Sequence, residues 1–360
     1  MKERVAVAMS GGVDSSVAAA LLKKQGYEVI GLTMCFNLAD STTKRPNCCG
    51  LEGIEDARRV AHKLGIRHYV LNFSKVLKEK VIADFCREYL RGRTPNPCVR
   101  CNQFIKFDAL LKKALSLDAG FLATGHYARI EKVVSRQSLV VSYLLKKAKD
   151  KKKDQSYFLY CLGQKQLRRI LFPLGDYTKE EVRNLARKFN LPIADKLASQ
   201  EICFLPDADY RRFLNTHAKA KIKPGPILDK EGNVLGQHQG VAFYTIGQRE
   251  GLGIARGYPL YVIEINPGNR SIIVGKKEDV YKDEFYLKNT HFIIGLKKKK
   301  VALRVKIRYN HPEAQAQVIV TGRKVKVKFS KPQFAVTPGQ SAVFYDHDTV
   351  VGGGVIGKVL

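Results

Sequence analysis

The segment Ser10–Ser16, which reads SGGVDSS, joins a predicted strand over Arg4–Met9 to a predicted helix over Ser15–Gln25. The first amides of a helix have no partner within the helix, and the helix dipole favours negative charge there. Gly11 and Gly12 carry no side chain that would keep main-chain amides away from phosphate oxygens. The segment therefore predicts a nucleotide-phosphate site on an α/β fold.

Side chains within the segment add to this predicted site. Ser10, Ser15 and Ser16 supply hydroxyl donors. Asp14 would repel phosphate unless a divalent cation lay between them, so we expect it to act through Mg²⁺. The segment differs from the Walker P-loop, which ends in Gly-Lys followed by Ser or Thr. The plain alternative is a glycine turn that only packs a helix on a strand.

Short apolar runs alternate with helical periodicity in the N-terminal part of the chain, which predicts a parallel sheet flanked by helices. Thr178-Lys-Glu-Glu181 is a capping box that predicts a helix to about Asn190. Gly92–Asn102 (GRTPNPCVRCN) is predicted to be a constrained loop, because it holds two prolines and two cysteines. The other predicted elements are strands over Val29–Phe36, His68–Phe73 and Phe121–Tyr127 and helices over Ile54–Leu64 and Val76–Leu90.

From about Pro224 the pattern changes to short alternating segments separated by turn signals at Lys230–Asn233, Asn266–Asn269 and Thr321-Gly322. Lys324–Phe329 (KVKVKF) alternates strictly, which predicts a half-buried strand with its lysines in water. We therefore expect a parallel-sheet domain, a small β-rich domain and a C-terminal β-barrel-like domain. Their expected ranges are 1–207, 208–277 and 278–360.

The charge of the chain is strongly basic. Lysine and arginine total 63 against 33 aspartates and glutamates, a formal net charge of +30. Such a field attracts polyanions and favours a nucleic acid partner, although a lysine-rich composition without any partner is the alternative. No run of apolar residues reaches the length of a membrane span, and the N-terminus lacks the pattern of a signal peptide. We expect a cytoplasmic protein without membrane contact.

The chain has eight cysteines, which in a cytoplasmic protein argue against a framework of structural disulfides. Three of them, Cys35, Cys86 and Cys161, lie in apolar runs and are predicted to be buried in cores. The other cysteines are left for thiol chemistry or for a metal.

Six further motifs follow the phosphate loop in chain order. They are Thr94–Phe107 (TPNPCVRCNQFIKF), Ala123–Tyr127 (ATGHY), Lys153–Leu159 (KDQSYFL), Ile202–Phe204 (ICF), Gly247–Gly253 (GQREGLG) and Thr337–Phe344 (TPGQSAVF). Together with the loop they resemble the tRNA-specific 2-thiouridylase family, whose phosphate loop is the PP-loop of the ATP pyrophosphatases (the adenine nucleotide alpha hydrolase-like fold). The similarity runs from the first strand to the closing β-domain.

The resemblance implies ATP-dependent adenylation of O2 of the wobble uridine, followed by sulfur transfer to give 2-thiouridine. By resemblance Cys203 carries a persulfide, and Cys101 closes a transient disulfide with it as sulfur is released. Met34 and Gly125 follow strands of the sheet, and the family places adenine near both. The implied ATP-binding residues are Ala8, Met9, Ser10, Gly11, Gly12, Val13, Asp14, Ser15, Met34 and Gly125.

The family also implies which residues meet tRNA and which partners take part. The target base must leave the anticodon stack to enter a pocket in the protein. Basic residues outside the pocket add contacts to the tRNA phosphates. The partners are tRNAs for Lys, Glu and Gln and a sulfur-relay or cysteine desulfurase protein. The implied tRNA-binding residues are Asn96, Pro97, Cys98, His126, Lys153, Asp154, Gln155, Arg308, Tyr309 and Gln340.

The chain departs from the common family pattern at Cys98, where many members have an aspartate. Cys98, Cys101 and Cys203 are three thiols that could hold an iron–sulfur cluster, whose spare iron could bind hydrosulfide. Cys48 and Cys49 could instead join Cys98 and Cys101 in a zinc site, although adjacent cysteines are poorly spaced as ligands. Persulfide relay and cluster-assisted transfer therefore both stay open, and no metal ligand is assigned firmly.

Two other functions remain as alternatives at this stage. A PP-loop amide synthetase would need a glutaminase module with its own nucleophile, and no such pattern is evident. A non-enzymatic RNA-binding protein would use the nucleotide site only for regulation. Release of AMP and pyrophosphate that depends on tRNA would exclude the RNA-binding alternative, and ammonia-dependent ATP turnover without RNA would favour the amide synthetase.

Overall fold

The computed structural model describes residues 2–36, 51–134, 141–197, 202–205, 209–218, 221–296 and 298–360. The chain divides into two compact units, which we call the first unit and the second unit. The first unit comprises Met1–Val81, Cys98–Ala208 and Asp348–Val350, and the second comprises Ile82–Pro97, Asp209–His347 and Val351–Leu360.

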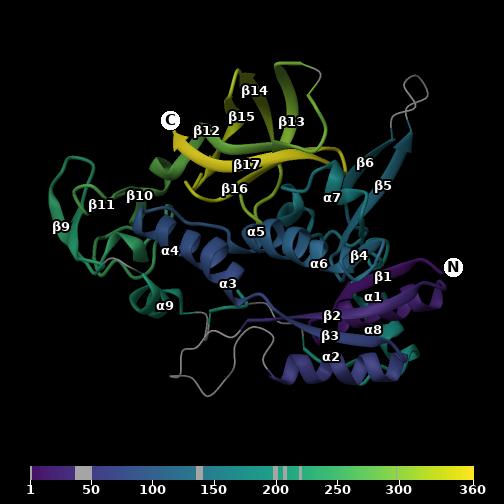
Figure 1. Cartoon of the computed structure of the whole chain (residues 1–360). Coiled ribbons are helices and arrows are strands. Elements are labelled where there is room, and N and C mark those ends of the chain that lie inside the picture. Colours follow the sequence, from purple (N-terminus) through teal and green to yellow (C-terminus); the bar gives the residue numbers. More distant parts are fainter. Residues whose placement is uncertain are drawn as a thin grey trace. The chain divides into compact units, whose positions relative to one another are not determined.

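The first unit contains the parallel sheet that the sequence predicts, in the strand order β3-β2-β1-β4-β7 (Figure 1). β1 lies at the centre, and Val5 is level with Val29 on one side and Phe121 on the other. Val5, Ala6 and Val7 are fully buried, as expected for a central strand covered on both faces. The strands are β1 (Arg4–Ala8), β2 (Glu28–Cys35), β3 (Arg67–Asn72), β4 (Phe121–Thr124) and β7 (Ile170–Leu171).

Helices α1 (Val13–Lys24), α2 (Leu51–Leu64) and α8 (Lys179–Lys188) pack on this sheet and form its main core cluster. The small residues Ala18 and Ala19 of α1 are fully buried and allow close approach of α1 to the sheet. The predicted capping box is confirmed: the Thr178 hydroxyl accepts a hydrogen bond from the Glu181 amide at 3.2 Å, and the Glu181 carboxylate accepts one from the Thr178 amide at 2.6 Å.

The segment Gly92–Asn102 differs from its prediction as a loop. Helix α5 (Pro97–Cys101) begins within it and leads into a π-helical stretch, Asn102–Leu110. Proline suits the first turn of a helix because its missing N–H would have no partner there. Ile105 and Leu110 are fully buried, so this stretch has an apolar helical face. The prolines and cysteines before it had indicated a loop instead. Helix α6 (Leu111–Leu115) continues the segment.

Several other elements of the first unit depart from the sequence prediction. The predicted helix over Val76–Leu90 is interrupted: α3 (Ser74–Val76) is followed by a π-helical stretch, Leu77–Ile82, and then by α4 (Ala83–Leu90), which belongs to the second unit. The sequence prediction also missed an antiparallel hairpin, in which β5 pairs with β6 and Thr349 and Val350 extend it. The strands of the hairpin are β5 (Ala128–Val134) and β6 (Val141–Lys147). A 3-10 turn at Ser156–Leu159 and α7 (Gln164–Leu167) follow it in the chain.

The second unit contains a small four-stranded sheet in the order β10-β11-β8-β9. Its predicted turns are confirmed, because Lys230–Asn233 connects β8 to β9 and Asn266–Asn269 connects β10 to β11. Helix α9 (Tyr210–His217) precedes the sheet, and Asp209 caps it by accepting from the amides of Arg211 and Arg212. The strands are β8 (Gly225–Leu228), β9 (Val234–His238), β10 (Tyr261–Asn266) and β11 (Ser271–Gly275).

The rest of the second unit is a closed β-barrel, since β12 pairs with both β15 and β17. The predicted alternation over Lys324–Phe329 is confirmed: Val325, Val327 and Phe329 are buried in the barrel core, whereas Lys324 and Lys328 are exposed. The barrel strands are β12 (Tyr281–Phe292), β13 (Lys300–Lys306), β14 (Ala314–Thr321), β15 (Lys324–Phe334), β16 (Ser341–Asp346) and β17 (Thr349–Val359). Within the described residues, no helix is both long and apolar enough to cross a membrane.

Candidate active site

The loop between β1 and α1 has a shape that only glycine permits at Gly11. Its φ is +73°, and a Cβ there would lie 2.3 Å from the carbonyl oxygen of Gly53 in α2. The Ser10 amide donates to the Ser15 hydroxyl oxygen at 3.2 Å, and the Ser16 hydroxyl donates to the Gly12 carbonyl at 2.9 Å. The loop is thus closed by its own hydrogen bonds and held against α2.

A pocket of about 190 Å³ opens at the carboxyl ends of β1, β2 and β4, where a parallel sheet usually binds its ligand. It brings together many of the residues that the sequence assigned to ATP, and two that it assigned to tRNA. The predicted residues that line it are Ala8, Met9, Ser10, Asp14, Ser15, Met34, Gly125, His126 and Gln155. Gly11, Gly12 and Val13 complete the loop but do not line the pocket.

Three lining residues were not predicted: Leu32, Lys106 and Thr124. Leu32 lies two residues before Met34 on the same strand and so faces the same side. Thr124 and Lys106 lie inside motifs that had been singled out, ATGHY and TPNPCVRCNQFIKF. Position at a strand end could have identified Thr124, whereas Lys106 reaches the pocket only because its segment is helical.

Asp14 lies at the edge of the pocket and is engaged by two residues that the sequence prediction missed. Its Oδ1 accepts a hydrogen bond from the Tyr127 hydroxyl at 2.8 Å and forms an ion pair with Lys179 Nζ at 2.6 Å. Lys179 is the first residue of α8, directly after its capping Thr178. Removal from water, followed by the neighbouring Asp14 charge, raises the pKa of Tyr127, which therefore stays a hydrogen-bond donor.

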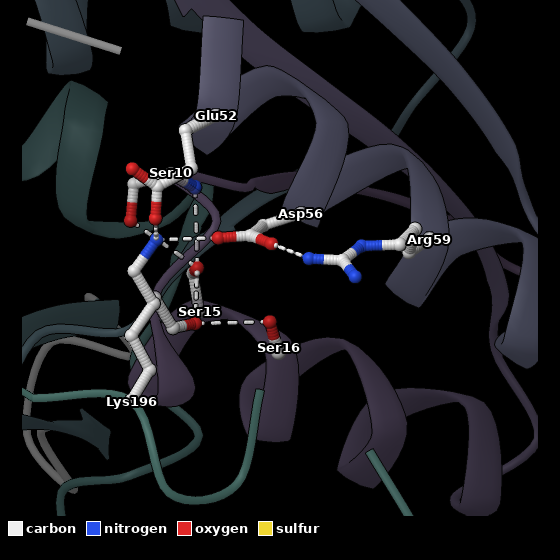
Figure 2. Close-up of polar contacts among 8 residues, drawn as sticks. Ser10, Ser15, Ser16, Glu52, Asp56, Arg59 and Lys196 are labelled. Carbon is white, nitrogen blue, oxygen red and sulfur yellow. Dashed lines mark hydrogen bonds and ion pairs between the residues drawn. The ribbon is translucent and has the colours of Figure 1, made fainter. Parts of the chain in front are cut away.

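A cluster of charged side chains, from α2 and from the segment after α8, lies close to the loop (Figure 2). The buried carboxylate of Asp56 is paired with both Arg59 and Lys196, and Lys196 also contacts Glu52 at 3.0 Å. Burial alone raises the pKa of Asp56, but hydrogen bonds from Lys196 and Arg59 outweigh it and hold that pKa below its usual value. The cluster joins α2 to the segment after α8.

The thiols that the sequence singled out differ in accessibility. Cys98 and Cys203 are exposed, whereas Cys101, at the end of α5, is 8% exposed. Cys98 and Cys203 lie close enough to influence each other: partial loss of solvation, then the Cys203 thiol, raises the pKa of Cys98, while Lys106 lowers it. Cys98, three residues before Cys101, is therefore within electrostatic range of Cys203.

The predicted burial of the other cysteines is correct for Cys86 and wrong in part for Cys35 and Cys161, which are half-buried. Loss of solvation nevertheless raises the pKa of Cys86 to about 11 and that of Cys161 to about 12, so both thiols stay protonated.

In the described part of the chain, His, Cys, Asp and Glu side chains do not form a group of three or more that could hold a metal ion. Cys98, Cys101 and Cys203 fall within that part and do not form such a group in this structure, so we derive no step through an iron–sulfur cluster. Cys48 and Cys49, the other proposed zinc ligands, lie outside the described residues.

Three consecutive residues of the first unit that are predicted to contact tRNA differ in their surroundings: one lines the pocket, and two lie in the loop before it. Gln155 lines the pocket, and its side-chain oxygen accepts from the Tyr127 amide at 3.0 Å. Asp154 holds its own loop, because its carboxylate accepts from the Ala148 amide at 3.0 Å and from the Ser156 hydroxyl at 2.8 Å. Lys153 is half-buried beside them.

The second unit holds the remaining predicted tRNA contacts. The side-chain amide of Gln340 donates to the carbonyl oxygens of Thr94 at 2.9 Å and Pro95 at 3.2 Å. Asn96 and Pro97 follow directly in the chain and end the part of this segment that belongs to the second unit.

Two further predicted contacts lie after β13 in the barrel. Arg308 donates to the carbonyl oxygen of Phe334 at 2.6 Å, so its guanidinium is fixed to the start of the β15–β16 connection. Lys306 Nζ lies 5.4 Å from the ring centroid of Tyr309, a cation–π distance. Both predicted residues are thus held by the barrel.

Comparisons with known proteins bear on the whole chain. Three family models match it: a tRNA methyl transferase HUP domain over residues 3–207, a tRNA methyl transferase PRC-barrel domain over 211–276 and an aminomethyltransferase beta-barrel domain over 282–356. Among curated proteins, the tRNA-specific 2-thiouridylase MnmA of Halothermothrix orenii is 53% identical over 98% of this chain and 99% of its own length.

Two more similarities complete the comparison. The tRNA-specific 2-thiouridylase MnmA 2 of Caldanaerobacter subterraneus subsp. tengcongensis is 54% identical over 98% of this chain and 97% of its own length. A solved complex of a 4-thiouridine synthetase with RNA and bound ATP aligns with a TM-score of 0.35 and 16% identity, covering 60% of this chain and 50% of that one. That structural similarity is too low to support an argument about this chain.

Proposed function

Since the chain belongs to the tRNA-specific 2-thiouridylase family, we propose that it binds ATP in the pocket beside Ser10–Ser16 and adenylates O2 of a tRNA uridine. Its activity is tRNA 2-thiolation, that of a tRNA sulfurtransferase. One observation carries the mechanism: the phosphate loop with its pocket and the neighbouring thiols of Cys98 and Cys203 belong to the same compact unit. Activation and sulfur transfer can therefore use a single substrate position.

The first step needs the phosphates of ATP held while O2 of the base attacks the α-phosphate. The free amides at the start of α1 and the hydroxyls of Ser10 and Ser15 suit the phosphates, and Met34 and Gly125 lie where adenine is expected. Asp14 is the residue that would hold Mg²⁺, which is commonly bound by one or two carboxylates together with substrate phosphates. Lys179 would then exchange its Asp14 partner for a phosphate oxygen.

The second step replaces the activated oxygen by sulfur. The terminal sulfur of a Cys203 persulfide attacks C2 of the base, a C–S bond forms, and the C2–O bond breaks with its electron pair leaving on AMP. A second thiolate then attacks Sγ of Cys203, which breaks the S–S bond and leaves 2-thiouridine and a protein disulfide. We assign the second thiol to Cys101, and an external dithiol must reduce the disulfide before the next turnover.

The family descriptions mention methyl transfer, whereas the relatives are named thiouridylases. The two exposed thiols beside the pocket favour sulfur. The products also differ in mass, because thiolation replaces an oxygen by a sulfur and methylation adds a CH₂ group. Mass spectrometry of nucleosides from treated tRNA therefore decides between the two chemistries.

The remaining assignments follow from the same proposal. The substrates are tRNAs for Lys, Glu and Gln, the sulfur comes from a relay or cysteine desulfurase protein, and the work is done in the cytoplasm. We infer that domains cover 1–207, 208–277 and 278–360, which the matches over 3–207, 211–276 and 282–356 support. The proposed tRNA contacts are those of the sequence analysis, with Gln155 and His126 placed in the pocket.

The test is a single-turnover thiolation assay with unmodified tRNA, ATP and a persulfide donor, run on the Cys98→Ser, Cys101→Ser and Cys203→Ser variants. Cys203→Ser should abolish 2-thiouridine, and Cys101→Ser should leave the base joined to Cys203 through an S–S bond, because the thiol that breaks this bond is missing. Cys86→Ala is the matched control, because that thiol is buried outside the site. Thiolation that survives in both Cys101→Ser and Cys203→Ser would overturn the assignment of roles.

Metal analysis of the same anaerobic sample tests the persulfide mechanism separately. The relay predicts sulfur transfer by iron-free protein. Stoichiometric iron that is lost in Cys98→Ser, together with lost activity, would replace the relay by a cluster mechanism. A result that assigns the second thiol to Cys98 rather than Cys101 would keep the relay and change one residue.

A further inference from the structure

Among the described residues that line the pocket, Lys106 is the one lysine or arginine. It projects from the π-helical stretch Asn102–Leu110, which follows directly after α5 and Cys101. Lys106 is half-buried, and its Nζ lies 3.4 Å from Nε2 of His126. A cation in a partly closed pocket needs an anion to offset its loss of solvation.

The protonation of His126 follows from its partners. A lysine ammonium has only donors, so Nε2 must accept the hydrogen bond from Lys106. The neutral ring then carries its proton on Nδ1, which lies 2.7 Å from the Thr124 hydroxyl oxygen and donates to it. Burial and the Lys106 charge both lower the pKa of His126 far below its usual value. At neutral pH His126 is therefore neutral, and its Nε2 is a fixed hydrogen-bond acceptor that does not take up a second proton.

The ring that holds Lys106 is itself held on both sides. Phe107 and Phe172 pack against His126 with ring centroids 5.7 and 5.9 Å away. Thr124 is 3% exposed at the end of β4. The chain Thr124–His126–Lys106 thus runs from the rigid sheet to the pocket and fixes the direction of one ammonium group.

Lys106 also influences a thiol, because its charge lowers the pKa of Cys98. The ammonium is therefore within electrostatic reach of both the phosphate pocket and a thiol next to Cys101. In the proposed reaction, these two sides meet at one group: the phosphate that links the activated base to adenosine. As the C2–O bond breaks, negative charge grows on that phosphate.

We propose that Lys106 contacts the phosphate of AMP and of the adenylated base and stabilises it as a leaving group, with His126 and Thr124 as its positioning residues. The proposal rests on the function proposed above. Lysine binds phosphate as a point charge, and a donor aimed at charge that develops in the transition state contributes more to rate than one aimed at the ground state.

The test separates phosphate contact from a merely structural role by comparing AMP with adenosine. Calorimetry should show Lys106→Met weakening AMP binding about tenfold, the usual worth of one charge-assisted hydrogen bond. Adenosine, which lacks the phosphate, should bind equally well to both proteins. Lys113→Met is the matched control, because it removes an exposed lysine from the adjacent α6. Equal weakening of AMP and adenosine, or no change in either, would overturn the proposal.

A kinetic and a spectroscopic measurement complete the experiment. In single turnover, AMP release from adenylated tRNA should fall about 100-fold in Lys106→Met and recover in part in Lys106→Arg. In ¹⁵N-histidine spectra the pKa of His126 should rise in Lys106→Met, since one of its two lowering causes is removed. An unchanged AMP release rate would also overturn the proposal. Wild-type protein that binds AMP through Lys106 but forms no thiolated tRNA would instead contradict the proposed function alone.

Discussion

Two segments of this chain attract attention in the sequence, and they reach their structures in different ways. The loop Ser10–Ser16 is closed by hydrogen bonds between residues at most five positions apart. The segment Gly92–Asn102 depends on distant partners, because Thr94 bonds to Thr245 and Gln340, which are 151 and 246 positions away. The first was predicted correctly as a strand–loop–helix turn, and the second was predicted wrongly as a loop throughout.

The difference has a physical cause. Where the local chain supplies its own partners, the types and spacing of residues are enough to specify the geometry. Where the partners come from another part of the fold, the same residue types are compatible with several conformations. The prolines of Gly92–Asn102 signal a loop, but Pro97 starts a helix because the residues after it bury an apolar face.

The strongest way to break the phosphate loop is Gly11→Ala. Its φ is +73° and an added Cβ would lie 2.3 Å from the Gly53 carbonyl oxygen, so any side chain is costly there. We expect a loss of about 3 kcal/mol, from backbone strain and overpacking together. Hydrogen exchange of the α1 amides measures it. Gly12→Ala is the control, because its φ is −97° and its nearest neighbour would be Ser10 Oγ at 3.5 Å; it should cost under about 1 kcal/mol. Equal costs would show that the loop is not held against α2.

The next largest expected effect tests whether the helix beside the loop depends on a partner that is distant in the sequence. Asp56 joins α2 to Lys196, which is 140 positions away, so Asp56→Asn should cost about 2 kcal/mol at neutral pH. The pKa of Asp56 is lowered by folding from its usual 3.8. The stabilisation is thus complete above pH 3.8 and is lost as the pH falls through the lower folded-state value.

Unfolding at a series of pH values measures this contribution as the difference between wild type and Asp56→Asn. The difference should stay constant at neutral pH and shrink below pH 3.8. The control is Asp195→Asn, which removes an exposed ion pair with Arg187 and should change stability by less than about 1 kcal/mol. A difference that grows in acid would mean that Asp56 is not ionised in the folded protein.

Gln340→Ala tests the second segment, which depends on distant partners. Its amide donates to two carbonyls of the cysteine-bearing segment, so its removal should leave those groups without a partner and cost about 1.5 kcal/mol. The amide of Thr94, which donates to Pro338, should then exchange its hydrogen faster. Gln333→Ala is the control, because its side-chain amide donates to the carbonyl of the nearby Lys331. Unchanged exchange at Thr94 would show that the segment keeps its shape without Gln340.

The candidate site shows the same division between local and distant determinants. Ser10, Ser15, Met34 and Gly125 could be assigned to one pocket from the sequence, because each follows or lies near the end of a parallel strand. Lys179 could not be assigned, since a helix start 165 positions from Asp14 gives no sign of that partner. The cysteine roles came from family resemblance alone, and the proximity of Cys98 to Cys203 is a result of the fold.

The smallest expected effect concerns a feature that the sequence specifies fully. Thr178 accepts from the Glu181 amide and its own amide donates back to the Glu181 carboxylate, so Thr178→Ala should cost α8 about 1 kcal/mol. Hydrogen exchange in the first turn of α8 measures it. Thr216→Ala is the control, because that hydroxyl donates to the carbonyl of a residue four positions earlier in α9 and caps no helix start. Since Lys179 directly follows the cap, a frayed first turn should also loosen its contact with Asp14, so the local capping box helps to hold a distant ion pair at the pocket. A Thr178→Ala variant with normal exchange in α8 would separate the cap from that contact.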